Sequence, residues 1–187
     1  MVRCRWVTAD PLYIDYHDHE WGVPQRESRV LFEMLCLEGQ QAGLSWITVL
    51  KKRERYRACF HGFDPHHIAA MTPQDVDALM QEAGLIRHRR KLEAIITNAR
   101  AWLAMAAAGE DFSRFIWGFV DHQPQVNRPQ GEAIPAKTAA SEALSRALKK
   151  RGFTFVGATI CYAFMQACGL VNDHQADCFC CPAQAGA

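Results

Sequence analysis

Apolar residues recur at helical spacing along most of this chain. In "SRVLFEMLCLE", Leu31, Phe32 and Leu35 fall on one face of a helix, and Ser28 is a suitable N-cap residue. The segments with helical patterns are 28–38, 45–60, 72–84, 89–109, 111–120, 141–152 and 157–169. Alternating patterns typical of strands are nearly absent. We therefore predict an all-α fold.

Start and stop signals support several of these boundaries. Thr72 before a proline predicts a helix start, and Gly84, Gly109 and Gly152 predict helix ends. The segment 121–138 contains three prolines and no apolar period, so it is expected to be a surface loop or a link between two helical halves.

Length and composition restrict the class of protein. The 187 residues suit one globular domain, 1–187, and 49% of them are hydrophobic, enough for a sizeable core. A net charge of +1 argues against binding to nucleic acid by gross charge alone, although local basic patches remain an option. No apolar run approaches the roughly 18 residues that span a bilayer, and "MVRCRWVTAD" lacks the apolar core of a secretory signal. We expect a cytoplasmic protein.

Cysteine and histidine residues gather near the two ends of the chain. His174 and Cys178 are four residues apart, so one helical turn would place them on the same side. Cys4 and His17 supply a second thiol and imidazole, and two Cys with two His form a ligand set that zinc prefers. A zinc clasp between 1–20 and 171–182 is one interpretation. In this interpretation, Cys180 or Cys181 could replace Cys178 as a ligand.

Aromatic residues are concentrated in the first 46 positions, where they alternate with acidic residues. This group consists of Trp6, Tyr13, Tyr16, Trp21 and Trp46. Flat rings with polar handles suit either core packing or a pocket for a planar, cationic ligand. Glu38 follows an apolar helix face, so its carboxylate needs a partner or its pKa should rise; the alternative is an exposed residue at a helix end.

Basic residues form three short runs, of which the last adjoins a turn. "LKKRGFTFVG" joins two predicted helices, and the backbone N–H groups at the start of the second helix could hold a phosphate. A helix-hairpin-helix element binds the DNA backbone in this way. The alternative is that all three runs are solvated helix faces.

Four long stretches together resemble bacterial 3-methyladenine DNA glycosylase I, a family within the helix-hairpin-helix glycosylase superfamily. They are "DPLYIDYHDHEWGVP", "LFEMLCLEGQQAGLSWITVLKKRERYRACF", "GLIRHRRKLEAIITNARA" and "LKKRGFTFVGATICYAFMQACGLVNDH". The resemblance implies a helical fold with a cleft between two helical parts, and an enzyme that flips and hydrolytically removes 3-methyladenine from alkylated double-stranded DNA, leaving an abasic site.

The resemblance also assigns roles to residues. It implies that Glu38 and Tyr16 hydrogen-bond the base, that Trp46 stacks on it, and that Trp6, Tyr13 and Trp21 lie near. It implies one structural zinc ion on Cys4, His17, His174 and Cys178. It implies a DNA-binding hairpin within 144–169 that includes Lys149, Lys150, Arg151, Gly152, Phe153 and Gly157. We expect a monomer with no obligate protein partner and no membrane contact.

Two features depart from the superfamily pattern. Gly152 and Gly157 are five residues apart, more than in the usual hairpin, and Asp173, the nearest candidate for a catalytic aspartate, adjoins His174. Asp173 is therefore interpreted as structural or auxiliary. Three other functions are considered: a non-catalytic zinc-containing DNA-binding module, a glycosylase of broader range, and a thiol sensor using "CFCC".

Overall fold

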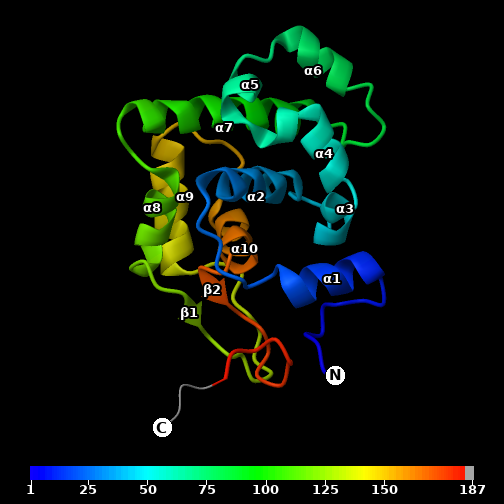
Figure 1. Ribbon diagram of the computed structural model, residues 1–187, viewed down its shortest axis with the longest axis vertical. Helices are drawn as coiled ribbons and strands as arrows, with labels where there is room; N and C mark the ends of the chain where they lie inside the picture. Colours follow the sequence, from blue (N-terminus) through cyan, green and yellow to red (C-terminus); the bar gives the residue numbers. More distant parts are fainter. Residues whose placement is uncertain (184–187) are drawn as a thin grey trace.

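The computed structural model describes residues 1–183, and these residues are mostly helical (Figure 1). The α-helices are α1 (Pro11–His19), α2 (Ser28–Gln40), α3 (Trp46–Leu50), α4 (Arg53–Cys59), α5 (Pro65–Ala69), α6 (Pro73–Leu79), α7 (Arg89–Ala107), α8 (Phe112–Trp117), α9 (Ala139–Lys150) and α10 (Ala158–Ala167). Two 3-10 helices, η1 (His61–Phe63) and η2 (Gly118–Val120), and two short strands, β1 (Gln125–Val126) and β2 (Val171–Asn172), complete the described elements. None of the helices in this part of the chain is long and apolar enough to cross a membrane.

Helix α2 lies at the centre of the molecule, between α7 on one side and α10 on the other (Figure 1). Every residue from Leu31 to Gln40 is buried, so the helix is covered on all sides over three turns. An apolar helix surrounded by other helices belongs to the core, where its position is fixed by packing. A polar side chain on this stretch is therefore held rigidly and is shielded from water.

The N-terminal residues and residues 175–179 meet at one end of the molecule (Figure 1). The backbone N–H of Phe179 donates to the carbonyl of Val2 at 2.9 Å, and that of Arg5 donates to Gln175 Oε1. This pairing brings the N-terminal aromatic segment, α1 and the C-terminal cysteines together.

Some helix boundaries differ from those predicted, and tertiary contacts explain the differences. The predicted helix 45–60 is divided into α3 and α4, and the break directs Arg53 onto Glu20. Helix α6 ends at Leu79 and not at Gly84. At Gly84, an added Cβ would lie 2.6 Å from Arg55 Cγ, so this glycine accommodates a close side chain.

Ser28 is not the N-cap of α2, as predicted, but its first residue. The cap position is occupied by Glu27, whose side chain makes no capping hydrogen bond. The Ser28 hydroxyl instead accepts a hydrogen bond from the backbone N–H of Ser113 at 3.1 Å. It thereby satisfies a backbone N–H in the first turn of α8, whose N-cap residue is Asp111.

The segment 121–138, predicted to be a surface loop or a link between two helical halves, also contains a short strand. Strand β1 from this segment pairs in parallel with β2, with Gln125 opposite Val171 and Val126 opposite Asn172. Two-residue strands are too short to carry an alternating pattern. The pairing attaches the segment to the end of α10.

Candidate functional site

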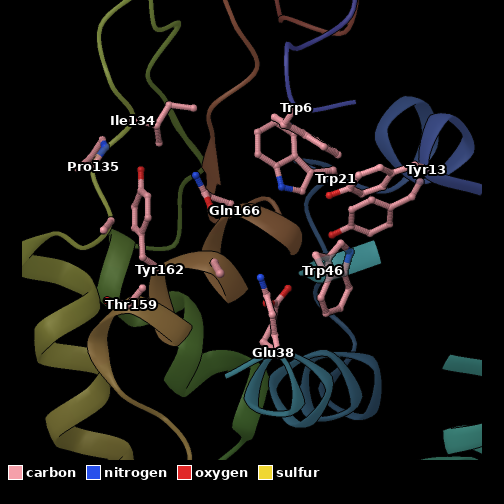
Figure 2. A pocket seen from close by; sticks show the side chains of 14 residues that line it. Trp6, Tyr13, Trp21, Glu38, Trp46, Ile134, Pro135, Thr159, Tyr162 and Gln166 are labelled. Atoms are coloured by element: carbon pink, nitrogen blue, oxygen red, sulfur yellow. The ribbon is translucent and has the colours of Figure 1, made fainter. Parts of the chain in front are cut away.

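An aromatic cavity of ≈ 340 Å³ lies between α1, α2, α3 and α10 (Figure 2). We call it the aromatic pocket. Its wall consists of Trp6, Tyr13, Tyr16, Trp21, Glu38, Gln41, Trp46, Ile134, Pro135, Ala136, Thr159, Tyr162, Ala163 and Gln166. All six residues that the sequence analysis assigned to a base pocket are in this wall.

Helix α1 positions the two tyrosines. Asp10 caps the helix by accepting from the N–H of Leu12 at 2.9 Å, and the next residue is a proline at the first helical position. Tyr13 and Tyr16, three residues apart, then point to the same side. Tyr16 is buried, and its burial together with the nearby Glu38 raises its pKa well above the usual value.

The aromatic rings pack against one another around the opening, edge to face at Trp6 and tilted between Tyr16 and Trp46. The Trp6 ring centroid lies 5.0 Å from those of Tyr13 and Trp21, and Tyr16 lies 5.7 Å from Trp46. These contacts fix the rings as a rigid frame. A planar guest that fits the frame can be selected by shape.

Glu38 projects from α2 into the aromatic pocket (Figure 2). It is only 3% exposed, and its Oε2 atom has no hydrogen-bond partner. Burial raises its pKa to about 8. The alternative of an exposed residue at a helix end is wrong, because α2 continues to Gln40 and the carboxyl group faces the interior.

Unpaired polar atoms converge on this cavity. Four buried side-chain polar atoms lack a partner within residues 1–183: Glu38 Oε2, Trp46 Nε1, Trp6 Nε1 and Trp102 Nε1. The first three belong to the pocket wall. An unpaired buried group costs about 1–3 kcal/mol, so three of them in one cavity indicate a ligand that supplies hydrogen-bond donors and acceptors.

Cys4, His17, His174 and Cys178 form a second buried polar site, which we call the Cys/His cluster. One potential ligand atom from each residue lies within 4.8 Å of the others. Cys178 Sγ is 3.5 Å from His17 Nε2 and 3.6 Å from His174 Nδ1, and Cys4 Sγ is 3.5 Å from His174 Nδ1. His174 and Cys178 meet across a turn and not on an α-helix.

The remaining imidazole nitrogens of the Cys/His cluster have their own partners. His17 Nδ1 is 2.7 Å from Asp18 Oδ1, and His174 Nε2 is 2.9 Å from the carbonyl oxygen of Trp21. Asp18 is in turn bound by Arg3, which lowers its pKa to about 2. Such outer contacts fix ring orientation and tautomer in metal sites.

The other terminal thiols lie beside the Cys/His cluster. Potential ligand atoms of Cys180, His17 and Asp18 lie within 4.8 Å of one another. Both Cys180 and Cys181 are partly buried. Burial raises the pKa of Cys180 to about 11. A reactive sensor thiol requires a lowered pKa, so this environment disfavours the thiol-sensor hypothesis.

Asp173 does not line the aromatic pocket but lies behind it. Its carboxylate is 2% exposed and accepts hydrogen bonds from Asn127 at 2.7 Å, from Gln166 at 2.9 Å and from the hydroxyl of Tyr162. Two of these donors are pocket residues. The carboxylate is thus fully engaged within the protein.

The turn between α9 and α10 distributes its predicted DNA-binding residues between surface and core. Lys149 and Lys150 are exposed, whereas Phe153 is buried against Phe112 with ring centroids 6.0 Å apart. The guanidinium of Arg151 is bound to Glu110, 2.7 Å away, and lies over Phe115. Gly152 has a φ of 92°, and Gly157 is the N-cap residue of α10.

Part of the pocket wall was not identified from the sequence. Thr159, Tyr162 and Gln166 recur along α10 at spacings of three and four, and this polar stripe on an otherwise apolar helix was a usable signal. Residues 134–136 belong to a segment without a periodic pattern, and nothing in the sequence places them here.

Comparisons with known proteins identify the family of this chain. The family described as methyladenine glycosylase matches residues 6–181. The chain is 67% identical over 183 residues to DNA-3-methyladenine glycosylase 1 of Escherichia coli (strain K12), covering 97% of this chain and 98% of that protein. This chain belongs to the methyladenine glycosylase family.

Two solved structures are similar throughout. A crystal structure of 3-methyladenine DNA glycosylase I has a TM-score of 0.95 and 68% identity, covering 97% of this chain and 100% of the other. A variant of 3-methyladenine DNA glycosylase I in complex with 3-methyladenine has a TM-score of 0.93 and 40% identity, covering 98% and 99%.

Proposed function

We propose that this protein is a base-excision repair enzyme that hydrolyses the N-glycosidic bond of 3-methyladenine in alkylated DNA. Family membership and relatives that carry this name support the activity. The single observation that carries the mechanism is the buried, unpaired carboxyl group of Glu38 in a wall of aromatic rings.

The chemistry of the substrate explains why such a pocket suffices. A purine methylated at N3 carries a delocalised positive charge while it is attached to the sugar, and it leaves as a neutral base. Its glycosidic bond is therefore already weak. The enzyme needs to extrude the damaged nucleotide, which costs a few kcal/mol, and to recognise its charge and shape before water completes the reaction.

Glu38 and the rings divide this recognition between them. The positive ring supplies the charge partner that Glu38 lacks, and binding it favours the ionised carboxylate. Trp46 stacks on the electron-poor ring, and Tyr16 hydrogen-bonds its edge. A healthy, neutral adenine leaves the carboxylate without a charge partner, so its binding in the pocket is less favourable than that of the cationic base.

In the same proposal, the Cys/His cluster holds one structural zinc ion. Its donors are two thiols and two imidazoles, all buried, and each imidazole has an orienting partner on its other nitrogen. Four protein ligands leave no open position for a water molecule, so the ion supplies cohesion between the chain ends and no catalytic step.

The α9–α10 turn is proposed as the helix-hairpin-helix element that binds the DNA backbone. Lys149 and Lys150 are exposed beside it, and the start of α10 carries free N–H groups for a phosphate. Arg151, engaged with Glu110, contributes to the shape of the turn. We propose that the protein acts as a single-domain monomer, with no obligate protein partner.

The test is to incubate the purified protein with methylated duplex DNA and identify every base released. Release of 3-methyladenine is expected. Release of several alkylated purines would indicate a glycosylase of broader range. Binding of the duplex without release of any base would contradict the proposal and leave a DNA-binding module.

A further inference from the structure

Lys91, on α7, has its ammonium group buried at the end of α2. The residue is 5% exposed, and its Nζ donates to the carbonyl of Gln40 at 3.0 Å and to that of Ala42 at 2.6 Å. Gln40 returns a hydrogen bond from its side chain to the Lys91 carbonyl at 2.9 Å, and its Oε1 accepts from the hydroxyl of Tyr56. A buried cation that binds two carbonyls fixes the path of the backbone there.

This path connects two walls of the aromatic pocket. Glu38 is two residues before Gln40, and Trp46 begins α3 only four residues after Ala42. Lys91 contacts neither side chain directly. It holds the turn that determines how far the carboxyl group lies from the indole ring.

Asn98, on the same helix, hydrogen-bonds the α9–α10 turn, which is the proposed DNA-binding element. It is 3% exposed, and its amide both donates to the carbonyl of Thr154 at 3.1 Å and accepts from the N–H of Thr154 at 2.8 Å. Thr154 lies in the turn between α9 and α10. The Asn98 side-chain amide therefore satisfies both backbone polar groups of Thr154.

The two buried residues share one face of α7. They are seven positions apart, which is about two helical turns. The end of α2 and the α9–α10 turn also lie in contact. A Cβ added to Gly39 would be only 3.1 Å from the carbonyl oxygen of Phe155. One rigid helix therefore sets the position of the pocket and of the turn with respect to each other.

We propose that Lys91 and Asn98 are positioning residues, Lys91 for the base pocket and Asn98 for the DNA-binding turn, with α7 as the rigid element that fixes the distance between base and backbone. This inference rests on the proposed function. A damaged base reaches Glu38 only if the turn holds the DNA at the right distance. Errors of about 1 Å in such placement cost up to about 100-fold in rate.

The experiment compares Lys91→Met with Asn98→Ala, and uses Glu93→Gln, an exposed change on α7, as the matched control. Three quantities are measured: affinity for free 3-methyladenine by tryptophan fluorescence, affinity for undamaged duplex DNA, and the melting temperature. Lys91→Met should weaken base binding about 10-fold, the size of a lost hydrogen bond, with duplex affinity nearly unchanged. Asn98→Ala should weaken duplex binding about 10-fold and leave the affinity for free 3-methyladenine nearly unchanged. The control should change neither.

A general structural role would give a different pattern. It would lower both affinities together, in proportion to the loss in melting temperature, and that result or unchanged affinities would overturn the inference. If Lys91→Met does not fold, Lys91→Arg, which keeps the charge and donors but alters their geometry, is measured in the same way. Failure of the wild-type protein to release 3-methyladenine would instead count against the proposed function.

Discussion

The aromatic pocket and the Cys/His cluster are both buried and polar, but they differ in how their polar atoms are satisfied. In the Cys/His cluster the four side chains face one another within 4.8 Å, and the outer nitrogens of both imidazoles have partners. In the aromatic pocket, Glu38 Oε2 and the Nε1 atoms of Trp6 and Trp46 have none. The first site is closed, and the second is open to a ligand.

This difference suggests that the Cys/His cluster serves stability and that the aromatic pocket serves ligand recognition. A closed set of ligands contributes to the folded state whenever its ion is present. An open set with an unpaired carboxyl group destabilises the folded protein slightly, and a ligand with the opposite charge relieves that cost. Substitutions in the two sites should therefore have opposite consequences for stability and activity.

The largest effect on stability is expected from Cys178→Ala. Removal of this thiol from the proposed zinc site should abolish zinc binding and lower the free energy of unfolding by at least about 4 kcal/mol. Metal content and urea denaturation measure both. Cys180→Ser, which changes the neighbouring thiol, is the matched control and should cost about 1 kcal/mol or less. An unchanged metal content in Cys178→Ala would show that this residue is not a ligand.

The largest effect on activity is expected from Glu38→Gln, which keeps the size of the side chain and removes its charge. Excision of 3-methyladenine should fall by about 100-fold or more, while affinity for duplex DNA stays nearly constant. Glu33→Gln is the matched control, since Glu33 lies on the same helix but is bound to Arg57 outside the pocket. Equal excision by wild type and Glu38→Gln would remove Glu38 from the mechanism.

The same substitution should stabilise the protein at high pH. The pKa of Glu38 is about 8 in the folded protein and near 4.5 when unfolded, so its contribution to stability is complete below pH 4.5 and is lost as the pH rises through 8. Glu38→Gln should match wild type near pH 5 and exceed it by about 1–4 kcal/mol near pH 9, at roughly 1.4 kcal/mol for each unit of pKa. Urea denaturation at both pH values tests this, and a constant difference between the two proteins would contradict it.

A smaller effect is expected from Tyr16→Phe. The ring remains in its frame beside Trp46, and only the hydroxyl that is proposed to hydrogen-bond the base is lost. Excision should fall by about 10-fold, with little change in melting temperature. A loss as large as that of Glu38→Gln would mean that the hydroxyl takes part in the chemistry itself.

Local patterns were sufficient for most helices, and they drew attention to the terminal Cys and His residues and to the aromatic segment that lines part of the pocket, whereas the roles assigned to these residues came from the family resemblance. As predicted, a helix ends at Gly109, which has a φ of 80°, and another starts at Thr72, which forms a capping box with Asp75. Cys4 and Cys178 could be grouped because zinc chemistry requires a specific set of side chains, independent of the intervening fold.

Features that depend on tertiary contacts could not be predicted in this way. The break between α3 and α4 places Arg53 at the start of α4, where it pairs with Glu20, a residue distant in sequence. Strand β1 exists only because β2 is beside it. Residues 134–136 follow β1 in the same segment and line the pocket, although their sequence has no pattern that indicates a site.

The most direct test of the charge-recognition mechanism is the pH dependence of 3-methyladenine excision from methylated duplex DNA at subsaturating concentrations, where the second-order rate constant reports the ionisation of the ligand-free protein. The ionised carboxylate is the form that pairs with the cationic base, so the wild-type rate should rise with pH and level off above about 8, the pKa of Glu38. The Glu38→Gln rate should be low and independent of pH in this range. Parallel pH profiles for the two proteins would contradict recognition of the damaged base by this carboxyl group.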